Sequence, residues 1–149
     1  MTESPFPDKL RINWFEDYHT HHLGELPDRK LAWGIETFAF INSDGSLGNH
    51  NTGTRVDYAI LFIFDRDGQF LSSNHWSSRQ TESSSYDELE KLVAARGGIT
   101  YRDIEIIPFM TTIDDVEFGL VRDPTTEMIS FEPHSIISFM EPWDGEYYT

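Results

Sequence analysis

The sequence predicts an α+β fold: a mainly antiparallel β-sheet of about six or seven strands, with one principal helix packed on one face. Most apolar segments alternate with polar residues at period two, which is typical of half-buried strands. Only the segment near 86–96 has a secure helical pattern. One helix cannot supply the long crossovers that parallel strands need. A chain of 149 residues is expected to form a single domain, 1–149.

The helix is predicted from its start signal, its apolar stripe and its end. Ser85 is the expected N-cap, and Glu88 three residues later completes a capping box. Gly97 is expected to end the helix, because glycine adopts a positive φ without strain. The buried stripe is expected to contain Tyr86, Leu89, Leu92 and Val93.

Strands are predicted before and after this helix. Residues 57–64 and 69–76 form an expected hairpin, joined by a tight turn at 65–68. Residues 31–41 favour a strand, whereas residues 10–23 fit either a strand or a helix. The strands expected after the helix are 103–109, 116–121, 127–131 and 135–140, with a type I turn at 123–126.

Negative charge is concentrated in the last third of the chain. The formal net charge is −15, and residues 103–149 carry eleven carboxylates against one basic residue, Arg122. Strand alternation places Glu105, Glu117 and Glu132 on outward faces, and the other acids fall in turns or in the tail. Such a surface attracts basic partners and repels nucleic acid and anionic membranes.

Aromatic residues lie beside these acids in the tail, and Trp and Tyr are enriched at the energetic centres of interfaces. The sequence therefore predicts an acidic, aromatic-flanked surface for a basic protein partner. The candidate partner-binding residues are Glu105, Asp114, Asp115, Glu117, Asp123, Glu127, Glu132, Glu141, Trp143, Asp144, Glu146, Tyr147 and Tyr148.

The composition also limits where the protein can be located in the cell and which kinds of site it can contain. The chain has no cysteine, which excludes disulfides, thiol nucleophiles and Cys-ligated zinc. No secretory signal is seen at the N-terminus, and the longest apolar run, 59–64, is far too short to span a membrane. The eleven basic residues are scattered, which disfavours direct nucleic-acid binding. We expect a cytoplasmic protein.

The best metal candidate is a group of histidines. His19, His21 and His22 follow Glu16 and Asp17, and closely spaced histidines can chelate a transition metal. The cluster lacks an established framework such as His-Glu-x-x-His. An exposed polar turn is the favoured interpretation, so no metal or cofactor is predicted.

The leading functional hypothesis is a small cytosolic protein that neutralises a basic partner, by analogy of charge and size with bacterial immunity proteins and phage anti-defence inhibitors. The first alternative is an enzyme or small-ligand binder, with the Gly- and Asn-rich loop 42–54, His50 and His75. No catalytic motif supports it, and an enzyme is the less favoured reading. The second alternative is a structural or assembly subunit.

Overall fold

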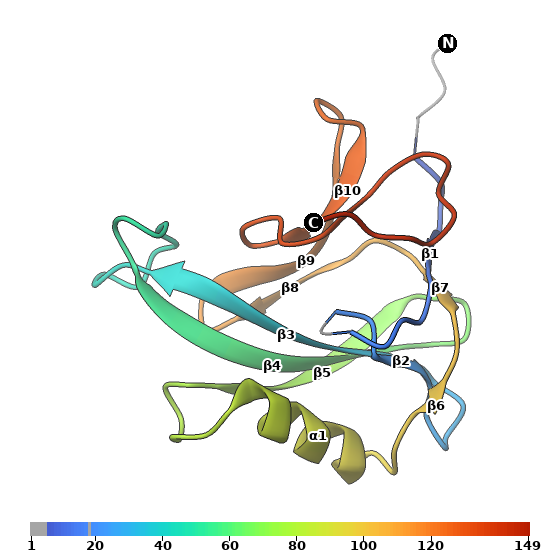
Figure 1. Cartoon of the computed structure of the whole chain (residues 1–149), viewed down its shortest axis with the longest axis horizontal. Coiled ribbons are helices and arrows are strands. Elements are labelled where there is room, and N and C mark those ends of the chain that lie inside the picture. The colour runs from blue at the N-terminus through green and yellow to red at the C-terminus, as the bar shows by residue number, and fades with distance from the viewer. Residues whose placement is uncertain (1–5, 18) are drawn as a thin grey trace.

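The computed structural model describes residues 6–17 and 19–149, which form eleven strands in three antiparallel sheets and one helix (Figure 1). The predicted α+β class is confirmed. The predicted number of strands, six or seven in one sheet, was too low. Several strands have only two to four residues and give almost no periodic signal.

The larger sheet has five strands in the order β5-β4-β3-β2-β6. Its strands are β2 (His22–Glu25), β3 (Leu31–Ile41), β4 (Thr54–Phe64), β5 (Phe70–Ser77) and β6 (Thr100–Tyr101). β3 and β4 pair along their whole length, from Leu31 opposite Phe64 to Ile41 opposite Thr54. The predicted strand over 31–41 and the predicted hairpin of 57–64 with 69–76 are both confirmed.

The C-terminal part of the chain forms a second sheet of four strands in the order β11-β10-β9-β8. Its strands are β8 (Met110–Ile113), β9 (Val116–Asp123), β10 (Met128–Glu132) and β11 (Ser138–Phe139). A two-stranded ribbon joins β1 (Leu10–Ile12) to β7 (Ile104–Ile106). The ambiguous segment 10–23 is thus mainly strand and irregular backbone in its described residues.

These elements stack in layers (Figure 1). Helix α1 (Ser85–Ala95) covers one face of the five-stranded sheet, and the four-stranded sheet lies over its other face. The main core lies between the two sheets, where the ring of Trp33 contacts Phe62 and Phe131 at centroid distances of 5.9 and 5.4 Å. A smaller apolar layer, including Leu89 and Val93, lies under α1. No helix among the described residues is long and apolar enough to cross a membrane.

The helix starts one residue earlier than predicted. Ser84 is the N-cap, and its side chain accepts a hydrogen bond from the backbone N–H of Asp87. Ser85 instead donates its hydroxyl to the carboxylate of Glu36 on β3 at 2.7 Å. Its side chain therefore makes a tertiary contact and does not cap the helix. Glu88 binds Lys91 rather than closing a capping box. The end at Gly97 is confirmed by its φ of 90°.

Three further expectations differ from the structure. Tyr86 is 56% exposed and lines a surface cavity with Glu36, while Leu89 and Val93 form the buried stripe. The expected strand over 135–140 is reduced to β11, because His134 and Ser135 adopt positive φ in a turn. The turn after Asp123 closes one residue later than predicted, through a backbone bond from the N–H of Glu127 to the carbonyl of Asp123.

Candidate protein-binding surface

The acids after Asp103 form no ion pair with any residue that the structure describes. Each ion pair among the described residues uses an acid at or before Asp103. The ten later acids form none, and they are Glu105, Asp114, Asp115, Glu117, Asp123, Glu127, Glu132, Glu141, Asp144 and Glu146. The charge asymmetry of the sequence is therefore not neutralised by folding.

Strand alternation sets the direction of the three acids on the predicted strands. Phe118 and Phe131 are fully buried, and Glu117 beside Phe118 is exposed. Glu105 is likewise exposed in β7. Glu132 is half-buried, and the hydroxyl of Ser135 donates to its carboxylate at 2.6 Å.

Three of the candidate acids meet in one groove on the four-stranded sheet. Asp115, Glu117 and Glu132 line a groove of about 530 Å³, together with Thr112, Val116 and Pro133. No Lys or Arg lines it. Its remaining lining residues are apolar and exposed: Leu47 by 50%, Met110 by 38% and Val121 by 37%. We call this site the acidic groove.

The β8–β9 turn places Asp115 at the groove in a left-handed backbone conformation. Asp114 and Asp115 have φ values of 53° and 65°, in the left-handed region that side chains other than those of Gly, Asn and Asp seldom adopt. The carboxylate of Asp114 accepts a hydrogen bond of 3.3 Å from Tyr58. Burial, with the charge of Asp114, raises the pKa of Tyr58 to about 12. Tyr58 therefore stays protonated and holds this turn against the main core.

The other candidate acids lie elsewhere. Asp123 and Glu127 flank the β9–β10 turn. Glu105 lies opposite Arg11 in the β1–β7 ribbon, in a pocket that also contains Lys9, Arg66 and Arg102. The structure thus brings three of the predicted carboxylates together and distributes the others over separate surfaces.

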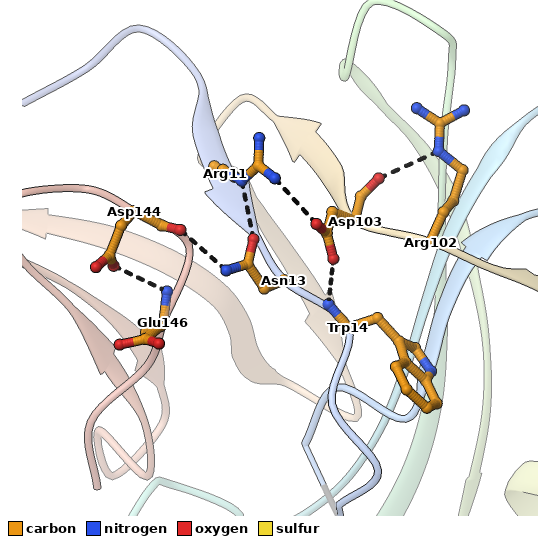
Figure 2. Close-up of polar contacts among 7 residues, drawn as sticks. All are labelled: Arg11, Asn13, Trp14, Arg102, Asp103, Asp144 and Glu146. Atoms are coloured by element: carbon orange, nitrogen blue, oxygen red, sulfur yellow. Dashed lines mark hydrogen bonds and ion pairs between the residues drawn. The ribbon is translucent and has the colours of Figure 1, made fainter.

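The acids of the tail lie next to the segment after β1 (Figure 2). The amide group of Asn13 donates to the backbone carbonyl of Asp144, and its backbone N–H donates to the carbonyl of Gly145. The carboxylate of Asp144 accepts the N–H of Glu146 at 3.2 Å. Glu141 is exposed. These contacts fix the tail against the protein while leaving its carboxylates exposed.

Two of the three tail aromatics are used inside the protein. Trp143 packs against Phe6 at a centroid distance of 6.1 Å and against the main core. The hydroxyl of Tyr147 donates to Asp17, and burial together with Asp17 raises the pKa of this tyrosine. Of the three, only Tyr148 is exposed, by 43%.

The histidines of the 19–22 segment take separate partners. His22 contacts the carboxylate of Glu90 at 2.8 Å, and His21 contacts the hydroxyl of Tyr101 at 3.3 Å. His19 packs against the ring of Tyr147. In the part of the chain that the structure describes, no group of three or more His, Asp or Glu side chains is arranged to hold a metal ion.

The residues of the enzyme alternative do not share a cavity. His75, on β5, lines a cavity of about 510 Å³ with Glu82 and Glu88. His50 is exposed in the loop between β3 and β4 and is not among the residues lining that cavity. The loop instead contributes Leu47 to the acidic groove, through a β-bridge between Leu47 and Ile41.

Sequence reasoning missed the apolar part of the groove. Val121 lies four residues after Glu117 on one strand, so alternation alone could have placed both on the outer face. Met110 belongs to β8, whose four residues gave no strand signal, and Leu47 lies in an irregular loop. Their positions depend on pairing between distant segments.

Comparison of the chain with protein-family models, with curated proteins and with solved structures finds no match.

Proposed function

We propose that this protein binds and neutralises a basic protein partner in the cytoplasm, in the manner of an immunity protein or an anti-defence inhibitor, and that the acidic groove is the main contact. The observation that carries the proposal is the composition of the groove: three carboxylates and three exposed apolar side chains, with no cation among its lining residues. A partner segment with Lys or Arg next to an apolar side chain complements it in both respects.

The physical roles of the two components differ. The unpaired C-terminal carboxylates raise the rate of encounter with a positively charged protein, an effect that falls with ionic strength. Leu47, Met110 and Val121 supply apolar area that leaves water on binding, worth roughly 25 cal/mol per Å². The absence of cysteine is compatible with a reducing cytoplasm.

The test compares wild-type protein with a groove variant, Asp115→Asn/Glu117→Gln/Glu132→Gln, in affinity capture from a cytosolic extract followed by titration of the captured protein. Because partly exposed ion pairs contribute about 0.5–1 kcal/mol each, we expect affinity to fall roughly 10- to 100-fold. Raising the salt concentration from about 50 to 500 mM should also weaken binding of the wild-type protein.

A matched control removes the same charge outside the groove. The variant Asp123→Asn/Glu127→Gln/Asp144→Asn should slow the encounter as the groove variant does, but it should keep the groove contacts and so lose much less affinity. The proposal fails if the two variants lose affinity equally, if the captured proteins are not basic, or if salt has no effect.

A further inference from the structure

Two buried polar atoms without hydrogen-bond partners belong to residues that line one cavity. Nδ1 of His19 and Oγ1 of Thr37 make no hydrogen bond with the described part of the chain. Both residues line a cavity of about 290 Å³, and Thr37 is only 6% exposed. Leaving such an atom without a partner is costly, so nearly all buried polar groups in native proteins have one. The cavity therefore has the features of a binding site for a hydrogen-bonding group.

The same cavity lies at an open edge of the five-stranded sheet. β2 flanks β3 only as far as the pair His22–Gly34. Beyond it, Phe40 directs its backbone groups away from β4, since its N–H donates to Nε2 of His134 and its carbonyl accepts from Gly48. Alternate residues of a strand point their backbone groups to the same side. Glu36 and Phe38 therefore present their N–H and C=O groups at this edge, where the described residues form no bond with them outside the strand ladder.

Carboxylates outnumber Lys and Arg among the described residues around this edge. Glu36 lines the cavity and also an adjoining one of about 260 Å³, which contains Glu16 and Asp17. The lining cation of the first cavity, Arg55, is already paired with Asp57 at 2.9 Å.

His19 adds a further acceptor. Burial lowers the pKa of His19, against the opposing charges of Asp17 and Glu36, so the ring is neutral at physiological pH. With its proton on Nε2, the ring presents a lone pair at Nδ1.

We propose that this cleft binds a guanidinium group carried on an apolar stem. A guanidinium has five N–H donors in one plane, and the lining residues offer it acceptors of three kinds: the Glu36 carboxylate, which also accepts from Ser85, Thr37 Oγ1 and His19 Nδ1. Phe38 and Ile136 provide apolar contact for the stem. The ring of Phe38 already lies 4.2 Å from the guanidinium of Arg55 and stacks on His134 at 5.6 Å, so the ligand's guanidinium is assigned to the acceptors and not to this ring.

This site goes beyond the proposed function and shares no lining residue with the acidic groove. Its test is isothermal titration and amide-shift NMR of the whole protein with agmatine and with N-acetyl-arginine amide. N-acetyl-citrulline amide is the matched control, because it keeps the shape, loses the charge and two N–H donors, and carries an acceptor oxygen in their place. We expect both guanidinium compounds to shift the amides of Glu36 and Phe38, and citrulline to bind at least 10-fold more weakly.

Variants connect the binding to the named atoms. Thr37→Val removes only the hydroxyl and Glu36→Gln only the charge, so each should weaken guanidinium binding, Glu36→Gln by roughly 10-fold. Thr112→Val, in the acidic groove, is the control for the threonine change. The groove variant with three neutralised acids should bind the guanidinium compounds unchanged, so this proposal and the proposed function can fail separately.

The outcomes decide the proposal and the source of the ligand. Binding of both compounds, the expected result, supports an arginine side chain delivered by a protein, whereas binding of agmatine without N-acetyl-arginine amide supports a free small-molecule guanidine. The proposal is overturned if neither compound binds, if citrulline or N-acetyl-lysine amide binds equally well, or if Thr37→Val and Glu36→Gln leave the affinity unchanged.

Discussion

The acids of this protein behave differently in the two parts of the chain. Up to Asp103, acids meet bases repeatedly, and Glu25 alone contacts Arg29, Arg66 and Arg102. After Asp103, none of the described acids forms an ion pair. The acids of the first group are offset by bases of the same protein, whereas the acids of the second group repel one another. A bound cationic partner would offset that repulsion, which is why we propose that the C-terminal acids serve binding rather than stability.

The largest predicted effect tests whether the two parts of the chain unfold independently or as one unit. Phe131 lies on β10 and is fully buried against Trp33 and Phe62 of the other sheet. Phe131→Ala should destabilise the whole protein by about 3–5 kcal/mol, the usual cost of a large cavity. Urea unfolding followed by tryptophan fluorescence and by circular dichroism should give coincident, shifted transitions. Two separate transitions would mean that the regions fold independently.

The second prediction sets the two groups of acids against each other. Glu25→Gln removes the shared partner of three arginines and should lower the free energy of unfolding by about 1 kcal/mol. Glu117→Gln removes one charge from an unpaired set and should leave stability unchanged or raise it by a few tenths of a kcal/mol.

Chemical denaturation at low salt measures both effects, and the difference between the variants should shrink at high salt. Equal destabilisation by the two substitutions would remove the distinction between paired and unpaired acids.

The third prediction concerns the turn that places Asp115 at the groove. Because Asp115 has a φ of 65°, Asp115→Gly should raise stability by up to about 1 kcal/mol. The same change removes a groove carboxylate and should weaken partner binding. Asp123→Gly is a control for the loss of charge, since Asp123 is not among the residues with positive φ and its carboxylate accepts the N–H of Thr125. It should not stabilise the protein.

The sequence predicted features that depend on local patterns. The α+β class, the helix with its end at Gly97, the β4–β5 hairpin and the outward direction of Glu117 all follow from periodicity and turn chemistry. The helix start was displaced by one residue because Ser84 and Ser85 are equivalent in sequence. Only the tertiary contact of Ser85 with Glu36 distinguishes them.

Features made by distant segments could not be predicted in this way. Tyr147 was expected at a partner surface, but its hydroxyl binds Asp17, 130 positions earlier in the chain. The acidic groove joins Leu47 of a loop to Met110 and Glu132 of the second sheet. His19 and Thr37 line the same cavity because the pairing of β2 with β3 stops at His22 opposite Gly34 and leaves the rest of β3 uncovered by β2. Nothing in the spacing of the two residues in the sequence signals this.

The smallest predicted effect is a pH dependence that arises away from the C-terminal acids. Burial lowers the pKa of His19 and of His134, whose Nε2 must be unprotonated to accept the N–H of Phe40. A histidine with a lowered folded pKa stabilises the protein fully above its unfolded value of 6.5, and this contribution is lost as the pH falls through the folded pKa.

The melting temperature should therefore decrease from pH 7.5 towards pH 5, and the decrease should be smaller in the variant His19→Gln/His134→Gln, since glutamine gains no proton. His50→Gln, at an exposed loop position, should follow the wild type. If the double variant loses stability over this range as steeply as the wild type, the acid sensitivity does not arise from the two histidines beside β3. It would then have to be sought among the carboxylates, which would link stability to charge in a region where we expect charge to serve binding.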